Sequence, residues 1–510
     1  MATAIEAFVH YIVDICVLER NMISPTDPRN RILLWAFVFA AIPYLYSVFN
    51  EDKRLASMTV EQAMQESWDK MITLPSMLFR KVVVGINCNV DVIVSGTNLY
   101  NHINPSLSKC SDHEVLKSTE DMRESFMEHM ANEETFASII KTIETSQQPK
   151  QYHIGGNAAL MAQRIAYSFP RTTAFLVGPI GPRSQALLHP SIVQNNSTRI
   201  LKDELHVIME YKQGEILGEY VAPTSSRFVF SHDKFSGSSV VIEMFFKAIS
   251  QFRPDLVILS GIHLLEFQNA EMRLEKIRLI KRSLLQINNG IPIHLQLGNM
   301  GDAVFASDLL ERIVGNVDSV GLNEQELTFL SKVGNGPYND EYPVSGGSLH
   351  VYKVVEMLHW LITKYGQDKS NVESKNYNYR LQRIHFHCLT YHLIVSRGTD
   401  WSNLAAGLAA GARVAGRHSC NIPQSETLDS GLLEVRSGSS YLLDKTMKKS
   451  YIFDPHRPVA SWMRNEIVFI YTPVLVCKFP TKTVGLDETI STTGLLYSQF
   501  YRIDHARMHL

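Results

Sequence analysis

The stretch DLVILSGIHLLEFQNAEMRLEKIRLIKRSLLQINNGIPIHLQL, residues 255–297, decides the fold class. It begins with an apolar run at 255–260 and ends with a second apolar run at 292–297, and a charged, amphipathic segment at 269–287 lies between them. Short apolar runs rich in branched residues are typical of buried strands, and the longer charged segment is typical of a helix. The stretch therefore predicts two parallel strands joined by a crossover helix.

The same alternation continues on both sides of this stretch. Further helices are expected at 240–251, 303–314 and 324–331, and further strands at 81–86, 173–177 and 319–321. Repeated strand-helix units of this length predict a mainly parallel central sheet with helices on both faces. The fold class is therefore α/β.

A second, smaller domain is expected in the first half of the chain. Apolar and polar residues alternate over 206–233 around glycines and a proline, which predicts an antiparallel hairpin. The segment 112–145 is polar and lacks Pro and Gly, so we expect it to be helical. These features predict a small α/β lid domain formed from parts of 90–235.

An apolar run near the N-terminus predicts a membrane anchor. Residues 32–48, ILLWAFVFAAIPYLYSV, contain no charge, and as a helix they would be about 25 Å long, short for a hydrocarbon core of about 30 Å but workable with aromatic anchors. Pro43 and the lack of a small-residue cleavage site favour an uncleaved anchor over a signal peptide. The alternative is a buried helix of a soluble domain. The predicted division is an N-terminal segment (1–31), a transmembrane signal anchor (32–49), a linker (50–77) and a globular part (78–505).

The composition excludes several classes of protein. Hydrophobic residues make up 45% and charged residues 20%, which excludes extended disorder. Lys plus Arg is 49 and Asp plus Glu is 51, so the net charge of -2 gives no electrostatic reason to bind nucleic acid. The six cysteines form no CxxC pair, which argues against a zinc ribbon. Oxidation of Cys388, Cys420 or Cys477 is possible in a lumenal domain, but spacing does not give the pairing.

Three motifs carry residues suited to phosphate, metal or sugar chemistry. The turn at 485–488 precedes an apolar helix, whose first N–H groups suit phosphate. The motif at 323–326 follows a short strand, where a carboxylate can hold hydrated Mg²⁺. Asn89 and Asp91 follow the first strand and suit sugar hydroxyls. Taken singly, each motif has a plainer explanation as a helix cap, a solvated helix start or a turn.

In their order along the chain, the motifs resemble those of the ADP-dependent sugar kinases of the ribokinase superfamily, and most closely the eukaryotic ADP-dependent glucokinases. The motifs are Gly-x-Asn-x-x-x-Asp, Gly-Gly-Asn-Ala, Asn-x-x-Glu and a carboxy-terminal glycine turn with a carboxylate. The resemblance covers about 78–505. It implies a ribokinase-like fold and transfer of a phosphoryl group from ADP to the 6-hydroxyl of glucose, giving glucose 6-phosphate and AMP with Mg²⁺. ADP and glucose are then the ligands, and no protein partner is implied.

The resemblance also implies a role for each motif residue. The sugar site would contain Asn89, Asp91, Gly155, Gly156 and Asn157. The catalytic group would contain Gly485, Asp487 and Glu488, with Arg227 near the transferred phosphate. The nucleotide would lie near His385, His387 and Gly411, and the metal near Glu326, Gln296 and Glu488.

Two departures from the family pattern fall at the chemistry. The family has Gly-x-Gly-Asp where this chain has Asp487 and Glu488 at the last two positions. A carboxylate in place of glycine crowds and repels phosphate, and the longer glutamate displaces the general base. The family also has His-x-Glu where this chain has Gln296, which loses a negative charge toward the metal.

Three interpretations follow from these departures. The first is an active ADP-dependent glucokinase, of reduced activity, that uses Glu488 as base, or Asp487 after a local shift. The second is a pseudoenzyme that keeps the sugar or nucleotide pocket as a binding module. The third is an interaction protein that has lost the pocket.

The expected location is the membrane of the endoplasmic reticulum, with a lumenal catalytic domain, or secretion if the leader is cleaved. Arginines precede the apolar run, which favours a lumenal remainder, and the resemblance implies the same compartment. Overlapping glycosylation sequons begin at Asn195 and Asn196, which fits a lumenal domain.

Overall fold

A computed structural model of the chain describes residues 58–501, apart from 104–114, 117–128, 132–139, 142, 213, 218–219, 223–225, 341–348, 368–377, 424–429 and 483. The chain divides into two compact units, residues 1–63 and 64–510. Both large sheets belong to the second unit, which is described below. The expected anchor at 32–49 lies outside the described residues, and among those that are described no helix is long and apolar enough to cross a membrane.

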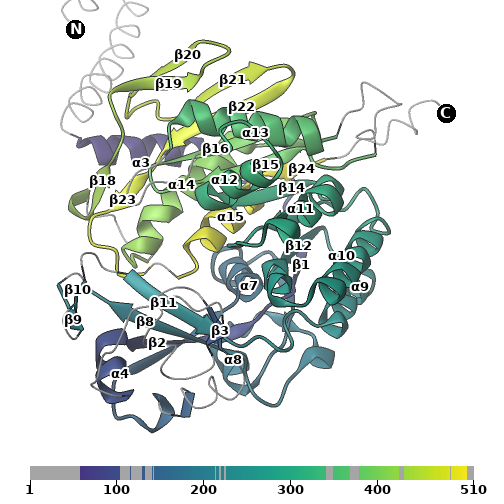
Figure 1. Cartoon of the computed structure of the whole chain (residues 1–510). Coiled ribbons are helices and arrows are strands. Elements are labelled where there is room, and N and C mark those ends of the chain that lie inside the picture. Colours follow the sequence, from purple (N-terminus) through teal and green to yellow (C-terminus); the bar gives the residue numbers. More distant parts are fainter. Residues whose placement is uncertain are drawn as a thin grey trace, which may run out of the picture. The chain divides into compact units, whose positions relative to one another are not determined.

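A ten-stranded sheet forms the centre of the second unit (Figure 1), in the order β21-β22-β16-β15-β14-β13-β12-β1-β6-β7. Its strands are β1 (Lys81–Gly85), β6 (Thr173–Val177), β7 (Val193–Gln194), β12 (Leu256–Ser260), β13 (Ile293–Gln296), β14 (Ser319–Asn323), β15 (Arg383–His387), β16 (Tyr391–Arg397), β21 (Ala460–Arg464) and β22 (Ile467–Pro473). From β7 to β15 all neighbours are parallel, and β16, β22 and β21 complete the sheet as antiparallel strands. The predicted mainly parallel sheet is therefore confirmed.

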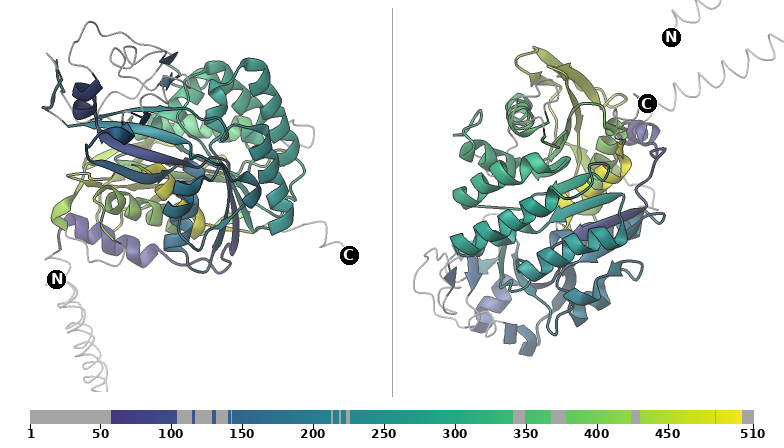
Figure 2. Two further views of the ribbon diagram at one scale, coloured as in Figure 1. Left: turned by 90° about the horizontal axis from the view of Figure 1, so that it is seen from below. Right: turned by 90° about the vertical axis from the view of Figure 1, so that its right-hand side faces the viewer.

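Helices cover both faces of this sheet, as the strand-helix alternation predicted. One core cluster combines the sheet with α9 (Ser239–Phe252), α10 (Ala270–Leu284), α11 (Ala303–Arg312), α12 (Glu324–Val333) and α13 (Val351–Tyr365). Another combines it with α7 (Asn157–Ser168), α14 (Leu404–Ser419) and α15 (Leu486–Tyr497). Side chains alternate along each strand, so Val83 packs into the first cluster and Val82 and Val84 into the second. Figure 2 shows the two helix layers on either side of the sheet.

A second sheet of six strands comes from the first half of the chain and has the order β3-β4-β11-β8-β2-β5 (Figures 1 and 2). Its strands are β2 (Asn89–Ser95), β3 (Val115–Leu116), β4 (His129–Ala131), β5 (Lys150–Gly155), β8 (Leu205–Tyr211) and β11 (Ser226–Ser231). β8 and β11 pair antiparallel, as the period-two pattern predicted. The helix predicted over 112–145 is wrong at β3 and β4, because pairing with β11 at the sheet edge outweighs local helix propensity.

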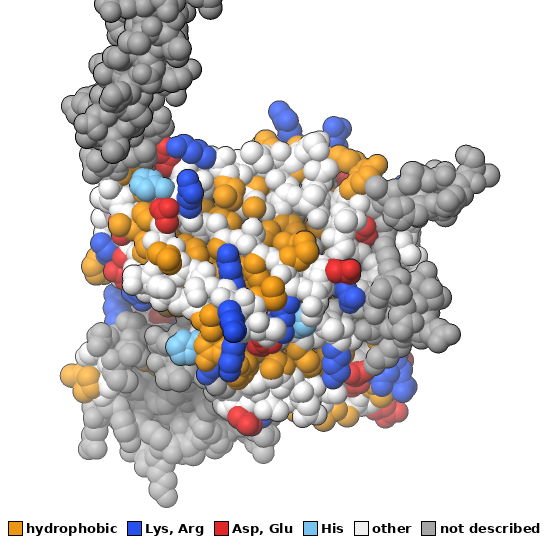
Figure 3. Space-filling model, turned by 90° about the horizontal axis from the view of Figure 1, so that it is seen from above, with side chains coloured by type: hydrophobic (Ala, Val, Ile, Leu, Met, Phe, Trp, Pro, Cys, Tyr) orange, Lys and Arg blue, Asp and Glu red, His pale blue; other side chains and the backbone are white. Residues whose placement is uncertain are grey.

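Smaller elements complete the unit. The short helices are α4 (Gly96–Ile103) and α8 (Pro182–Leu187), and the two-stranded pairs are β9 (Ile216–Leu217) with β10 (Tyr220–Val221), β17 (Trp401–Ser402) with β24 (Gln499–Phe500), β18 (Leu433–Val435) with β23 (Leu475–Cys477), and β19 (Ser440–Asp444) with β20 (Lys449–Ile452). Near β20 and β21, Met447, Ile452 and Met463 are exposed. On the face seen in Figure 3, lysines and arginines are scattered among the hydrophobic side chains.

Helices α14 and α15 pack closely because glycines face the contact. A Cβ atom on Gly407 would lie 2.6 Å from the Gly494 carbonyl oxygen and 2.7 Å from Ser498 Oγ. A Cβ atom on Gly494 would lie 2.6 Å from His385 Cε1. The small residues therefore let α15 approach both α14 and the sheet, and this approach sets the position of the N-terminus of α15.

We predict that Gly407→Ala lowers the free energy of unfolding, by up to about 2 kcal/mol. Overpacking against backbone atoms costs about 1–3 kcal/mol, which exceeds the gain of about 1 kcal/mol in helix propensity. Denaturant unfolding followed by circular dichroism measures the change. Gly438→Ala is the control, because the nearest atom to its added Cβ is 3.9 Å away. A Gly407→Ala protein as stable as the parent would contradict this account of the contact.

Candidate active site

The predicted sugar-binding pair lies at the start of β2. Asn89 and Asp91 are both buried, with 1% and 5% of their surface exposed, and Asn89 Nδ2 donates to Asp91 Oδ1 at 2.7 Å. In the register of β2 and β5, Asn89 lies opposite Gly155. The amide therefore orients the carboxylate before any ligand binds.

The glycines at 155 and 156 are required by this geometry. A Cβ atom on Gly155 would lie 2.1 Å from Asp91 Oδ1, and Gly156 has a φ of 84°, which favours glycine. Asn157 follows as the first residue of α7 and is half-buried. Asn87 also belongs to the group, since its Oδ1 accepts from the Ala158 N–H at 2.9 Å. The structure thus brings all five predicted sugar-site residues together at the N-terminus of α7.

A buried histidine–carboxylate pair adjoins Asp91 and was missed by sequence reasoning. His206 lies opposite Asp91 in the register of β2 and β8, and its Nε2 is 2.9 Å from Asp233 Oδ1. Burial lowers the pKa of His206, but the charge and hydrogen bond of Asp233 outweigh this and raise it to about 9. Burial raises the pKa of Asp91, and the charge of His206 opposes that shift. A cationic histidine therefore helps to keep Asp91 ionised.

The glycine turn predicted at the head of the last helix is present. Gly485 has a φ of 75° and precedes α15 as its N-cap, so the left-handed conformation favours glycine there. Asp487 lies in the first turn, with Oδ2 accepting from Asn323 Nδ2 at 3.1 Å and Oδ1 3.3 Å from His387 Nε2. Burial raises the pKa of Asp487, but the charge and hydrogen bond of His387 and the bond from Asn323 lower it overall. Asp487 is therefore a paired carboxylate.

Glu488, the second carboxylate of this turn, is in a different environment from Asp487. It is only 8% exposed. Burial and then the charge of Asp487 raise its pKa, and the more distant charge of Asp91 acts in the same direction. The N-terminus of α15 and the Asn89–Asp91 pair are therefore within electrostatic reach of each other, as a shared active site requires.

Glu326 is the third carboxylate of the cluster that contains Asp487 and Glu488, and it lies at the start of α12. Asn323 Oδ1 accepts from the Glu326 N–H at 3.0 Å, and Glu326 Oε2 accepts from the Asn323 N–H at 2.9 Å, which forms a capping box at the start of α12. Burial and then the charge of Asp487 raise the pKa of Glu326 to about 8. Asn323 thus links Glu326 to Asp487. Its position just after a predicted strand is the sequence signal that points to this role.

The donor chemistry of this group fits a hard divalent cation. Glu326 and Glu488 both have raised pKa values, in part because Asp487 carries a nearby negative charge, and a cation would relieve that repulsion. Within the described part of the chain, no three His, Cys, Asp or Glu side chains converge closely enough to hold a metal directly. Glu326 and Glu488 are therefore the residues of this cluster whose chemistry would suit such a cation.

Gln296, predicted as a metal ligand, is buried where β13 and β14 meet α15. It is 1% exposed, and its Oε1 lies 3.4 Å from His294 Nε2, which in turn is 3.2 Å from Ser491 Oγ. A Cβ atom on the neighbouring Gly321 would lie 2.3 Å from the same Oε1. The amide is packed between the sheet and α15, so nothing in its contacts supports a metal role.

A cavity of about 460 Å³ extends from Asp487 along the carboxyl edge of the sheet. This volume falls within the range of about 300–1,000 Å³ usual for ligand pockets. Most of its lining comes from 323–325, 387–389, 415–419, 474–478 and 486–490. His387 is among the lining residues, as predicted for the nucleotide site, and the cavity adjoins the carboxylate group at Asp487.

His385 and Gly411 are not among the residues that line this cavity. His385 is fully buried, and a Cβ atom on Gly411 would lie 3.3 Å from its Cε1 and from the Ile490 carbonyl oxygen. Both residues take part in the packing of α14, α15 and β15. Arg227, on β11, is exposed, and its charge lowers the pKa of Asp91. Arg227 is therefore close enough to Asp91 for its charge to act on that carboxylate.

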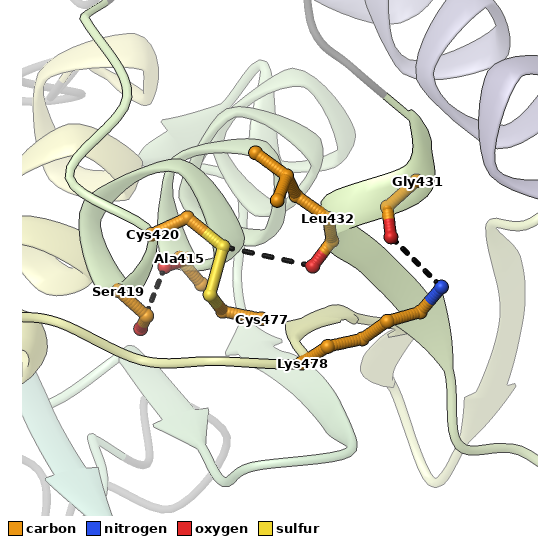
Figure 4. The surroundings of a disulfide bond; sticks show 7 residues. All are labelled: Ala415, Ser419, Cys420, Gly431, Leu432, Cys477 and Lys478. Atoms are coloured by element: carbon orange, nitrogen blue, oxygen red, sulfur yellow. Dashed lines mark hydrogen bonds between the residues drawn. A yellow bond between two sulfur atoms is a disulfide. The ribbon is translucent and has the colours of Figure 1, made fainter.

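A disulfide links Cys420 to Cys477 (Figure 4), and Cys477 is one of the residues that line the cavity. It joins the end of α14 to β23, with 5.5 Å between the two Cα atoms. Lys478 Nζ donates to the Gly431 carbonyl at 2.9 Å beside it. Cys388, the third residue considered for oxidation, is a free thiol. The pairing depends on the proximity of segments 57 residues apart, which spacing alone does not give.

The fold and the site together define a ribokinase-like sugar kinase architecture. Among solved structures, an ADP-dependent kinase in complex with fructose-6-phosphate and ADPbetaS matches with a TM-score of 0.60 at 15% identity, over 86% of this chain and 97% of that one. A hypothetical ADP-dependent phosphofructokinase from Pyrococcus horikoshii OT3 matches with a TM-score of 0.59 at 17% identity, over 83% and 98%. At this identity the matches show the fold.

Sequence similarity identifies the family. The model of the "ADP-specific Phosphofructokinase/Glucokinase conserved region" matches residues 80–497, and the chain belongs to this family. It is 57% identical to the "Probable ADP-dependent glucokinase" of Caenorhabditis elegans, over 93% of this chain and 96% of the relative. It is 34% identical to the "ADP-dependent glucokinase" of Bos taurus, over 86% and 89%.

The His206–Asp233 pair makes a prediction about stability and pH. Because the folded pKa of His206 is raised to about 9 from 6.5, its stabilisation is fully present below about pH 6.5 and is lost as pH rises through 9. The free-energy difference between the parent and His206→Gln should therefore shrink by up to about 3 kcal/mol over this interval. Denaturant titrations at several pH values measure the difference. His456→Gln, at an exposed site, is the control, and a difference for His206→Gln that does not change with pH would contradict the assignment.

Proposed function

We propose that this protein is an ADP-dependent glucokinase, transferring a phosphoryl group from ADP to the 6-hydroxyl of glucose to give glucose 6-phosphate and AMP. The observation that carries the proposal is the joining of the heads of α12 and α15, where Asn323 bonds both Glu326 and Asp487 beside Glu488. The relatives named ADP-dependent glucokinase, at 57% and 34% identity, support the choice of ADP and of glucose.

Each end of the site has a distinct part in the proposed reaction. Asn89 and Asp91 accept and orient sugar hydroxyls, with the backbone at Gly155 close enough to approach the sugar. The N–H groups and the positive end of α15 receive the transferred phosphoryl group. Glu488 takes the proton of the attacking hydroxyl, and its raised pKa suits a general base that works near neutral pH. Arg227 supplies positive charge from the lid.

The paired state of Asp487 favours an active kinase over a binding module. A lone carboxylate at a phosphate cradle repels the phosphate. Here His387 and Asn323 hold both oxygens of Asp487, so its charge is partly neutralised and its side chain is turned toward the sheet. No comparable observation favours the binding module. The third alternative, an interaction protein, requires that the pocket be lost, whereas a cavity of about 460 Å³ adjoins Asp487.

We further propose Mg²⁺ as the cation of this site, held through water by Glu326 and Glu488 and by oxygens of the nucleotide. When bound, such an ion neutralises charge on the phosphates. The chain's own contribution is to fix the two carboxylates through the Asn323 capping box and the first turn of α15.

For the location we propose the lumen of the endoplasmic reticulum, with the chain anchored through 32–49. The Cys420–Cys477 disulfide supports an oxidising compartment. The side chain of Asn196 is exposed, as glycosylation at its sequon requires.

The kinase proposal is tested with Glu488→Gln. The parent should release AMP from ADP only when glucose and Mg²⁺ are both present. Loss of the general base should lower kcat by about 10²–10⁴-fold while ADP still raises the melting temperature, because the cavity of about 460 Å³ is unchanged. The exposed Glu466→Gln should leave kcat at the parent value. A parent that binds ADP without glucose-dependent AMP release would instead establish the binding module.

The proposed location is tested through the sequons. Protein expressed in animal cells should shift to a smaller mass on treatment with an endoglycosidase, and Asn196→Gln should remove the shift that depends on the exposed site. Asn195→Gln is the comparison, since the Asn195 side chain accepts a hydrogen bond from the Ser197 N–H. A parent mass unchanged by the enzyme, together with free thiols at Cys420 and Cys477, would contradict a lumenal domain.

A further inference from the structure

The β19–β20 hairpin combines exposed apolar side chains with a turn rich in lysine. Met447 in the turn is 51% exposed and Ile452 on β20 is 76% exposed. Lys445, Lys448 and Lys449 are exposed beside them. The hairpin lies at the top of Figure 1, the side that faces the viewer in Figure 3. Single exposed apolar residues are common, but apolar residues grouped with cations suit a partner that is apolar and anionic.

The apolar residue on β20 points away from the protein. Tyr441 and Tyr451 pair across the hairpin, and both rings pack against Tyr471 of the large sheet. Side chains alternate along a strand, so Ile452 lies on the opposite face from Tyr451. The hairpin therefore has one face packed on the protein and one outer face.

The only acidic residue of the segment 440–452 is turned inward. Asp444 is 0% exposed, and its Oδ1 accepts from the Met447 N–H at 2.9 Å. Its Oδ2 accepts from Trp462 Nε1 at 3.0 Å. Thr446 Oγ1 donates to Glu356 Oε1 at 3.0 Å, which ties the turn to α13. The lysines are therefore presented on a fixed turn whose own carboxylate is buried.

The chain leads from the predicted anchor to a point beside this hairpin. In α3 (Val60–Met71), Ser67 Oγ donates at 2.8 Å to the His456 carbonyl, which lies between β20 and β21. Trp68 is 0% exposed and donates from Nε1 to Thr472 Oγ1 on β22 at 3.0 Å. Residues 49–66 separate the apolar run from Ser67, and they span at most about 60 Å when fully extended. With the run in a bilayer, the hairpin stays within reach of the membrane surface.

We propose that the outer face of the β19–β20 hairpin docks on the anionic surface of the membrane that holds the proposed anchor. Lysines near a membrane are attracted to acidic lipid headgroups. Met447 and Ile452 can enter the boundary between headgroups and acyl chains, while the lysine stems cover apolar surface and their ammonium groups stay among the headgroups. The inference rests on the proposed location and is independent of the kinase reaction.

The test is hydrogen exchange of the full chain reconstituted in two kinds of vesicle, phosphatidylcholine alone and phosphatidylcholine with phosphatidylserine at about 2:1. Exchange over 440–452 should be about threefold slower or more in the anionic vesicles. The difference should disappear in about 0.5 M NaCl, because salt screens the attraction. The β9–β10 hairpin is the control, since Ile216 and Val221 are exposed but no lysine lies between them. Its exchange should be equal in both lipids.

Variants and flotation separate the outcomes. Lys448→Glu combined with Lys449→Glu should abolish the difference, whereas Lys247→Glu, exposed on α9, should keep it. A chain that floats with the vesicles but leaves 440–452 unprotected would overturn the docking alone. A chain that floats with neither lipid would overturn the docking together with the anchor. Flotation that alkaline carbonate reverses, with the hairpin protected beforehand, would contradict the anchor and support the docking. Slow exchange that needs no vesicles and increases with protein concentration would identify a second copy as the occupant and would overturn the proposal.

Discussion

The electrostatic repulsion among four carboxylates is the constraint on which the site depends. Asp91, Glu326, Asp487 and Glu488 come from both sheets and from the head of α15, and each is buried or half-buried. Burial is the largest cause that raises the pKa values of Glu326 and Glu488, and the negative charge of Asp487 adds to it. His387, His206 and the positive end of α15 supply the opposing charge. Charges of both signs are therefore held close together at the heads of α12 and α15.

Close backbone approach is what brings these charges together. Gly155 leaves room for Asp91, Gly321 leaves room for Gln296, and glycines on α14 and α15 let the last helix reach the sheet. Any larger residue at these positions would move a charged group by an ångström or more, and active-site chemistry is sensitive to displacements of that size. The packing of α7, α14 and α15 therefore also sets the positions of the functional groups at their N-terminal ends.

The structure shows which residues contact the two positions that depart from the family pattern, and these contacts change how each departure is interpreted. Considered as sequence, Asp487 is an extra negative charge in a phosphate cradle. In the structure it is paired with His387 and Asn323, and these contacts offset part of its negative charge. Gln296 is likewise accommodated, because its Oε1 lies 3.4 Å from His294 Nε2. Both positions illustrate that the effect of a substitution depends on contacts made by segments distant in the chain.

The sequence by itself determined the α/β class, the parallel sheet, the glycine turn at 485 and the glycine turn that opens α7, because periodicity and backbone requirements are local properties. Only the tertiary structure decided the Cys420–Cys477 pairing, the inward packing of His385 and Gly411, the strands within 112–145 and the His206–Asp233 pair. Each of these depends on which segments become neighbours after the chain has folded. Contacts of that kind are set by the packing of whole layers, and no local pattern in the sequence encodes them.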